Sequence, residues 1–160
     1  SGPATDAAKR DYPWTARRCQ QRVKRGIQAM SREQISYYQA KLRYETDASD
    51  LFAALSAREN LVVIDTRSRE AFATEHIPGA VNIPHRSLSE DTTAQLDKEA
   101  DYVTYCDGIG CNASTKGALM LAQLGFSVRE LLGGLDWWRR DGYATQGAHA
   151  AAGKTPSCGC

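Results

Sequence analysis

Long apolar runs are absent from this 160-residue sequence. No stretch approaches the roughly 18–20 consecutive apolar residues that a membrane-spanning helix requires. The first residues also lack the apolar segment that marks a secretion signal. The sequence therefore predicts no membrane partner, and it leaves open a targeting segment that has been removed.

Cysteine is scarce as well. Five scattered cysteines do not make the dense framework of a small disulfide-stabilised secreted domain. We therefore expect a reducing compartment and a cytoplasmic location. The spacings of the last four cysteines fit no usual zinc-ligand pattern, so we expect no metal site. The cysteines are Cys19, Cys106, Cys111, Cys158 and Cys160.

Neither sign of charge is in clear excess, because the chain has 20 basic and 19 acidic residues. The net charge of the whole chain therefore indicates no particular partner, and the sequence leaves the oligomeric state open. Residues 1–30 differ, since they hold a cluster of basic side chains. Such an arm either contacts nucleic acid or anionic lipid, or is a solvated, mobile terminus. We favour the second interpretation and expect no nucleic-acid partner. The basic residues are Lys9, Arg10, Arg17, Arg18, Arg22, Lys24 and Arg25.

The composition is typical of one soluble globular domain with extensions, with 42% hydrophobic and 24% charged residues. Residues 1–30 read as the basic N-terminal arm and residues 31–143 as the domain. Residues 144–160 are rich in small residues and read as a flexible C-terminal tail.

Short β-branched runs alternate with helical patterns along the domain, which predicts an α/β fold with a parallel sheet. An edge strand is expected near Tyr44–Thr46. The other predicted strands cover residues 61–64, 80–83, 102–105 and 128–132.

Capping residues mark where the helices begin. Ser31 and Gln34 have the spacing of a capping box, which predicts a separate helix from Ser31 to about Leu42 after a helical arm over residues 15–30. Asp47 predicts the start of another helix. Later helices are expected over residues 114–124, with Gly125 as the C-terminal cap, and 135–141.

Cys106 stands at the carboxyl end of a predicted parallel strand, which is where such sheets bind ligands. Two glycines follow, and then a helix. Glycines permit backbone angles that turn successive N–H groups into one hollow, and the helix adds its positive N-terminal end. We expect this loop to stabilise an anionic sulfur and to lower the pKa of the thiol. The alternative is a structural cysteine buried beside a turn.

Three segments of the domain form a further pattern. The first runs over Val63-Ile64-Asp65-Thr66-Arg67 and continues through Glu70 and Phe72 to His76-Ile77-Pro78-Gly79-Ala80-Val81-Asn82-Ile83-Pro84. The second is Tyr105-Cys106 with its glycine-containing loop. The third is Gly133-Gly134-Leu135-Asp136-Trp137-Trp138. In this order, the three segments resemble the signatures of rhodanese-like domains. The resemblance implies a central, mostly parallel sheet of five strands flanked by helices.

The resemblance also implies a thiosulfate sulfurtransferase-like enzyme with Cys106 as its nucleophile. Sulfur would pass from a small donor such as thiosulfate to Cys106 as a persulfide, and then to cyanide, a small thiol or a protein cysteine. No cofactor is required. The donor would bind mainly to the backbone of the loop, and Asp107 would weaken that binding unless its side chain points away. The loop residues are Asp107, Gly108, Ile109, Gly110, Cys111 and Asn112.

The loop departs from the family pattern. Cys111 occupies a position where many sulfurtransferases carry a basic or hydroxyl side chain, which makes efficient use of thiosulfate doubtful. A phosphatase loop would need arginine at the position of Asn112, so phosphatase activity is not expected. Cys111 either fills the loop or attacks oxidised Cys106 to form an internal disulfide. The second role gives the alternative function, a redox-sensing or interaction module that uses this cysteine pair.

Other motif residues have structural interpretations. Asp65 and Arg67 are expected to form a buried ion pair at a strand end, although Arg67 would alternatively lend positive potential to the loop. His76 is expected to hydrogen-bond within the fold. For His85, a position near the pocket rim is the less favoured alternative. Of the two tryptophans, one should lie in the hydrophobic core and the other should form part of the pocket wall. The tryptophans are Trp137 and Trp138.

Overall fold

The structure is a computed structural model that describes residues 16–156. The chain divides into two compact units, residues 1–40 and 41–160. The second unit contains the sheet and the Cys106 loop, whereas helix α1 makes up the described part of the first.

Helix α1 runs without a break over Ala16–Tyr44. The predicted new helix at Ser31 is therefore wrong: the predicted arm and the beginning of the predicted domain share one helix. Capping by serine requires an extended backbone at that residue, and the good helix formers on both sides of Ser31 favour continuation instead. Several apolar side chains of α1 are exposed, including Ile27 and Leu42. Within residues 16–156, no helix is both long and apolar enough to cross a membrane.

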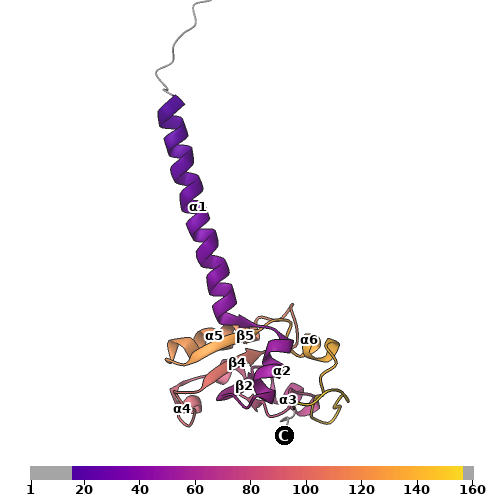
Figure 1. Cartoon of the computed structure of the whole chain (residues 1–160). Helices are drawn as coiled ribbons and strands as arrows, with labels where there is room; N and C mark the ends of the chain where they lie inside the picture. The colour runs from indigo at the N-terminus through magenta and orange to yellow at the C-terminus, as the bar shows by residue number, and fades with distance from the viewer. Residues whose placement is uncertain (1–15, 157–160) are drawn as a thin grey trace, which may run out of the picture. The chain divides into compact units, whose positions relative to one another are not determined.

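The second unit is built on a five-stranded sheet with the order β1-β5-β4-β2-β3. Every pair of neighbouring strands is parallel, which confirms the predicted α/β class. Figure 1 shows helices on both sides of this sheet. The strands are β1 (Glu45–Thr46), β2 (Leu61–Asp65), β3 (Val81–Asn82), β4 (Asp101–Tyr105) and β5 (Ser127–Leu131).

The helices predicted at Asp47, over residues 114–124 and over residues 135–141 are present in that order, and three short helices lie between the first two of them. Asp47 caps α2 by accepting a hydrogen bond from the Asp50 N–H at 2.8 Å, as expected. Gly125 follows α5 with a φ of +84°, a conformation that glycine adopts without steric cost. The helices are α2 (Ala48–Ser56), α3 (Arg69–Thr74), the 3-10 helix η1 (His85–Ser87), α4 (Glu90–Thr93), α5 (Ala113–Gln123) and α6 (Gly134–Arg140).

Alternation of side chains along the strands creates two separate cores. Val103 and Tyr105 of β4 face one side, where they pack with residues of α2 and α6. Tyr102, the residue before Val103, faces the other side and packs with Leu121 of α5. Neighbouring side chains of a strand point to opposite faces, so β4 packs into one core on each face of the sheet. Packing on both faces holds the end of the strand in position. The carboxyl end of β4, where Cys106 follows, is thus firmly placed.

Residues 144–156 differ from the flexible tail that the sequence predicts. Ala144 and Thr145 are buried. The backbone of Gln146 exchanges hydrogen bonds with that of His76 at 2.8 and 2.9 Å, and the N–H groups of Ala148 and His149 donate to the last residues of α3. Small side chains let this segment lie directly against another backbone, so the composition that suggested disorder instead permits close packing. The last four residues of the predicted tail lie outside the described residues.

Replacing Gly147 with alanine should destabilise the second unit. Gly147 has a φ of +120°, and a Cβ there would lie 2.6 Å from the Thr74 carbonyl oxygen. We expect the free energy of unfolding to fall by roughly 1–3 kcal/mol because the strain has no easy relief. Urea unfolding followed by circular dichroism measures the loss.

Gly26→Ala is the matched control, because a Cβ at Gly26 meets nothing within 4 Å and the residue lies in α1. Its substitution should leave the unfolding midpoint of the sheet unit unchanged. An equal midpoint for Gly147→Ala and the wild type would show that residues 144–156 do not contribute to the stability of the fold.

Candidate active site

Two neighbouring strands deliver the site residues to one edge of the sheet. β2 and β4 pair in register, with Asp65 opposite Tyr105. The next residues, Thr66 and Cys106, therefore leave the sheet side by side. The Thr66 N–H and hydroxyl both donate to the Tyr105 carbonyl, at 3.1 and 2.7 Å. This pairing brings the first signature segment against the cysteine.

The backbone of the Cys106 loop is fixed by the beginning of α6. The N–H groups of Leu135 and Asp136 donate to the carbonyls of Cys106 and Asp107 at 2.9 and 2.8 Å. Gly134 allows this approach, since a Cβ there would lie 2.2 Å from the Cys106 carbonyl oxygen. The sequence marks Gly134 only as part of the third signature segment. Its φ of +54° and its contact with Cys106 make it a positioning residue of the loop.

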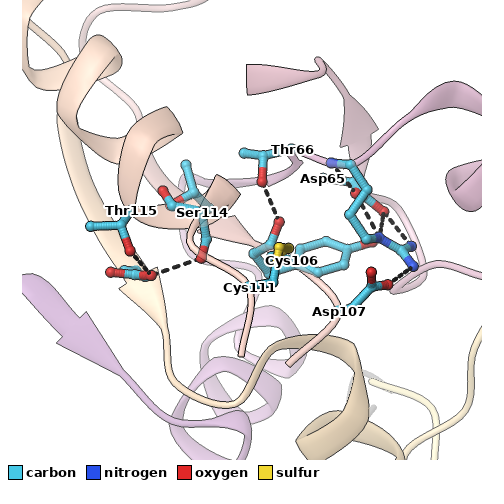
Figure 2. The surroundings of a disulfide bond; sticks show 11 residues. Asp65, Thr66, Cys106, Asp107, Cys111, Ser114 and Thr115 are labelled. Atoms are coloured by element: carbon cyan, nitrogen blue, oxygen red, sulfur yellow. Dashed lines mark hydrogen bonds and ion pairs between the residues drawn. A yellow bond between two sulfur atoms is a disulfide. The ribbon is translucent and has the colours of Figure 1, made fainter. Parts of the chain in front are cut away.

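Cys106 and Cys111 are joined by a disulfide bond, with their Cα atoms 6.2 Å apart (Figure 2). Cys106 is only 1% exposed, whereas Cys111 is partly exposed. Of the two roles that the sequence left open for Cys111, the structure shows the bonded one. The thiolate and the lowered pKa expected for Cys106 belong to a reduced state and stay predictions.

The loop glycines do not have the backbone that the sequence suggested. Neither Gly108 nor Gly110 has a positive φ. The Cys111 N–H donates to the Gly108 carbonyl at 3.1 Å, so it is used in a turn. Gly108 instead allows close packing, because a Cβ there would contact the Asp136 Cβ at 3.4 Å. With the disulfide formed, the Cys111 N–H is therefore not available to the hollow of N–H donors that the sequence predicts.

The far end of the loop is anchored by the first turn of α5. The Ser114 and Thr115 hydroxyls donate to Glu130 Oε1 at 2.7 and 2.8 Å, and the Thr104 hydroxyl donates to the Ser114 carbonyl at 3.1 Å. Figure 2 shows this anchor on one side of the disulfide, with Asp65 and Asp107 on the other. Asn112 precedes α5 without a side-chain cap. Both ends of the loop are therefore held by the sheet.

Arg67 forms the buried ion pair that the sequence predicts. Its Nη2 and Nε donate to both carboxylate oxygens of Asp65, at distances of 2.7 to 3.2 Å. Nη2 also donates to the Glu75 carbonyl at 2.6 Å. Burial alone lowers the pKa of Arg67, but the hydrogen bonds to Asp65 and Asp107 outweigh it and raise that pKa above its ordinary value. Arg67 stays charged and ties β2 to the segment after α3.

Asp107 meets the same arginine from the loop side. Its Oδ1 accepts from Arg67 Nη1 at 2.8 Å, while its side chain is 71% exposed. Arg67 thus connects a buried carboxylate with an exposed one. The alternative role of Arg67, positive potential beneath the loop, is reduced because both acids offset its charge.

Tyr105 lies beneath this network and is fully buried. Its hydroxyl accepts a hydrogen bond from the Ile77 N–H at 3.1 Å, and its ring lies 5.6 Å from the Arg67 guanidinium carbon. Burial raises the pKa of the phenol, and the negative charge of Asp65 raises it further. Tyr105 is therefore a neutral structural support and not a proton donor near pH 7.

Two hollows open on either side of the disulfide loop. The smaller, of about 330 Å³, is lined by both cysteines together with Arg67, His85 and Arg86. His85 thus lies at the pocket wall, the position that the sequence did not favour. Arg86 was missed: it follows His85 in η1, and only the folded chain brings it to the loop. The hollow is consequently bordered by basic side chains although the loop itself has none.

The larger hollow, of about 640 Å³, is lined by loop residues from Asp107 to Cys111 and by side chains of α6. Trp137 is 42% exposed and walls this hollow, whereas Trp138 is completely buried and donates to the Ala144 carbonyl at 2.9 Å. The predicted division between the two tryptophans is confirmed. Cys111 borders both hollows, so it is reachable from either side.

His76 has the structural role that was expected. Its Nδ1 lies 2.7 Å from the Phe72 carbonyl oxygen, and its ring stacks on that of Phe72. Among residues 16–156, no group of three or more His, Cys, Asp or Glu side chains is arranged to hold a metal ion. Cys158 and Cys160 lie outside the described residues.

Residues 48–141 match the family described as the Rhodanese-like domain. The chain therefore belongs to the rhodanese-like family. Its fold is similar to that of solved structures: the BH2092 protein of Bacillus halodurans is 42% identical, with a TM-score of 0.72 over 78% of this chain and 91% of that one. The rhodanese-like domain of Anabaena Alr3790 is 27% identical, with a TM-score of 0.59 over 66% of this chain and 80% of that one.

Curated relatives carry two kinds of name. The thiosulfate sulfurtransferase GlpE of Pseudomonas putida F1 is 35% identical over 100 residues, which are 62% of this chain and 84% of GlpE. The HTH-type transcriptional regulator Rv0324 of Mycobacterium tuberculosis is 34% identical over 82 residues. This match covers 51% of the present chain but only 36% of Rv0324.

Removing each carboxylate partner of Arg67 in turn should show that the buried ion pair contributes more to the free energy of unfolding than the exposed one. Asp65→Asn leaves a buried guanidinium without its main counter-charge and should cost about 3 kcal/mol or more. Asp107→Asn, at an exposed carboxylate, should cost less than about 1 kcal/mol. Chemical denaturation of both variants measures the difference. Equal losses would contradict the assignment of Asp65 as the structural partner.

Proposed function

We propose that this protein is a sulfurtransferase that carries sulfane sulfur on Cys106 as a persulfide. The observation that carries the proposal is the position of Cys106, at the carboxyl end of β4 and at the wall of a basic hollow. The names of the GlpE relatives support it, and thiosulfate is therefore the first donor to test.

The smaller hollow suits an anionic donor. Arg86 borders it together with Arg67, and a guanidinium favours binding of a compact dianion, whereas Asp107 at the same wall opposes it. The reduced Cys106 thiolate would attack the outer sulfur of thiosulfate, forming a persulfide and releasing sulfite. Acceptors of the persulfide sulfur belong to the same proposal: cyanide, a small thiol or a protein cysteine. A cytoplasmic location belongs to it too, because the reaction begins from a reduced cysteine.

A second candidate function is redox sensing, and the Cys106–Cys111 disulfide favours it. In that case oxidant would form the bond directly, and the closed loop would be the signal that a partner reads. The two functions differ in their first product, since one adds a sulfur atom to the chain and the other removes two hydrogens.

The Cys106→Ser variant should lose persulfide formation completely. Reduced protein is freed of reductant and offered thiosulfate, a mercaptan donor and peroxide in turn, and its intact mass is recorded. We expect sulfur uptake or donor-dependent oxidation in the wild type and neither in Cys106→Ser. A variant in which Cys19, Cys158 and Cys160 are all serine is the matched control and should behave as the wild type. Oxidation by peroxide with no response to any donor would favour redox sensing instead.

Neutralising Asp107 should improve the use of thiosulfate. Asp107→Asn removes a negative charge that now pairs with Arg67, which leaves Nη1 of Arg67 available to an anion. We expect the KM for thiosulfate to fall by about twofold to fivefold, the size of one exposed ion pair. The effect should shrink at high salt. Asp91→Asn, on α4 and away from both hollows, is the control; an equal change there would point to overall charge and not to the loop.

A further inference from the structure

Persulfide transfer by Cys106 leaves Cys111 without a task, although Cys111 is the residue that contacts Cys106 directly. The disulfide joins the sulfur of Cys111 to the Cys106 Sγ. In a persulfide, that Sγ is the inner sulfur, and the transferable sulfur is attached outside it. A bond from Cys111 to this inner sulfur displaces the outer sulfur. To accept the outer sulfur, Cys111 would have to bond to the outer sulfur instead.

We propose that Cys111 resolves the Cys106 persulfide, so that the protein reduces sulfane sulfur to hydrosulfide at the expense of a dithiol. This inference rests on the proposed persulfide chemistry and deepens it. The closed loop is then the oxidised intermediate of a catalytic cycle.

The atoms and electrons of the cycle balance. Cys106 thiolate and thiosulfate give the Cys106 persulfide anion and sulfite. The Cys111 thiol then attacks the inner sulfur, the S–S bond of the persulfide breaks, and the outer sulfur leaves as hydrosulfide with the proton of Cys111. Two electrons pass from the two cysteine sulfurs to the released sulfur, and the Cys106–Cys111 disulfide remains. A dithiol reductant restores both thiols and becomes a disulfide itself.

The geometry is suited to resolution. The two Cα atoms are 6.2 Å apart, which lies within the ordinary range for a disulfide. Both ends of the loop are fixed independently of the bond, by α6 at the Cys106 carbonyl and by Glu130 at the first turn of α5. The attacking sulfur is thus held near its target without a large rearrangement of the fold.

Exposure determines which sulfur the reductant reaches. Cys106 is 1% exposed, so an incoming thiolate reaches its sulfur less readily than that of Cys111. Cys111 is partly exposed and borders both hollows. The dithiol therefore attacks Cys111, and Cys106 leaves as the thiolate that begins the next cycle. The larger hollow, walled by the exposed Trp137, gives room for a dithiol peptide to approach.

A single-turnover experiment tests the inference on the full chain. Reduced protein without free reductant receives one equivalent of thiosulfate, and sulfite, hydrosulfide and intact mass are measured together. The wild type should release one hydrosulfide per sulfite and lose two hydrogens in mass. Cys111→Ser should release sulfite without hydrosulfide and retain one extra sulfur atom. The variant with serine at Cys19, Cys158 and Cys160 should match the wild type, which assigns the resolving thiol to Cys111.

The outcomes separate the two levels of the proposal. Sulfite release with a stable persulfide in both the wild type and Cys111→Ser would overturn resolution and leave the sulfurtransferase proposal standing. A persulfide that moves from Cys106 to Cys111, seen by peptide mass spectrometry, would also overturn it. If thiosulfate releases no sulfite from any of these proteins, and a mercaptan donor leaves neither a persulfide nor a disulfide on them, both levels are overturned.

Discussion

The parallel register between β2 and β4 is the constraint on which the rest of the site depends. It sets Asp65 beside Tyr105 at the same edge of the sheet, so the chain leaves both strands at one point. Cys106 and Arg67 are separated by 39 positions along the chain, yet each follows its strand closely. Two cores, one on each face, keep these strand ends from shifting. A slip of one residue in β4 would exchange its buried faces and move Cys106 away from Arg67.

The site combines a rigid frame with one chemically changeable bond. Arg67 links the strand end to the loop through Asp65 and Asp107, and α6 holds the loop carbonyls through backbone N–H groups. Neither set of contacts requires the disulfide. Reduction and oxidation of the cysteine pair can therefore proceed on a fixed scaffold. This arrangement fits both a persulfide carrier and a thiol that resolves it.

The elements that the sequence predicted well are those with strong local signals. β-branched runs such as Leu61–Asp65, and the cap at Asp47, depend on neighbours in the sequence, so local propensity and structure agree. The failures have a common cause. Ser31 has the form of a cap, but its backbone is helical because the residues around it favour helix. Residues 144–156 have few large side chains, and their order comes from hydrogen bonds to α3, which no local pattern contains.

The sequence by itself determined the chemistry that is available: a cysteine after a buried strand, a second cysteine five residues later, and an Asp-x-Arg pair. These depend on residue type and spacing alone. Tertiary structure decided which groups meet. It joined Cys106 to Cys111, gave Asp107 the Arg67 guanidinium as its partner, and brought Arg86 to the pocket wall. It also placed Gly134 against the Cys106 carbonyl. Apart from the cysteine pair, these contacts connect residues 20 or more positions apart, and only the pairing of strands and the docking of helices bring such residues together.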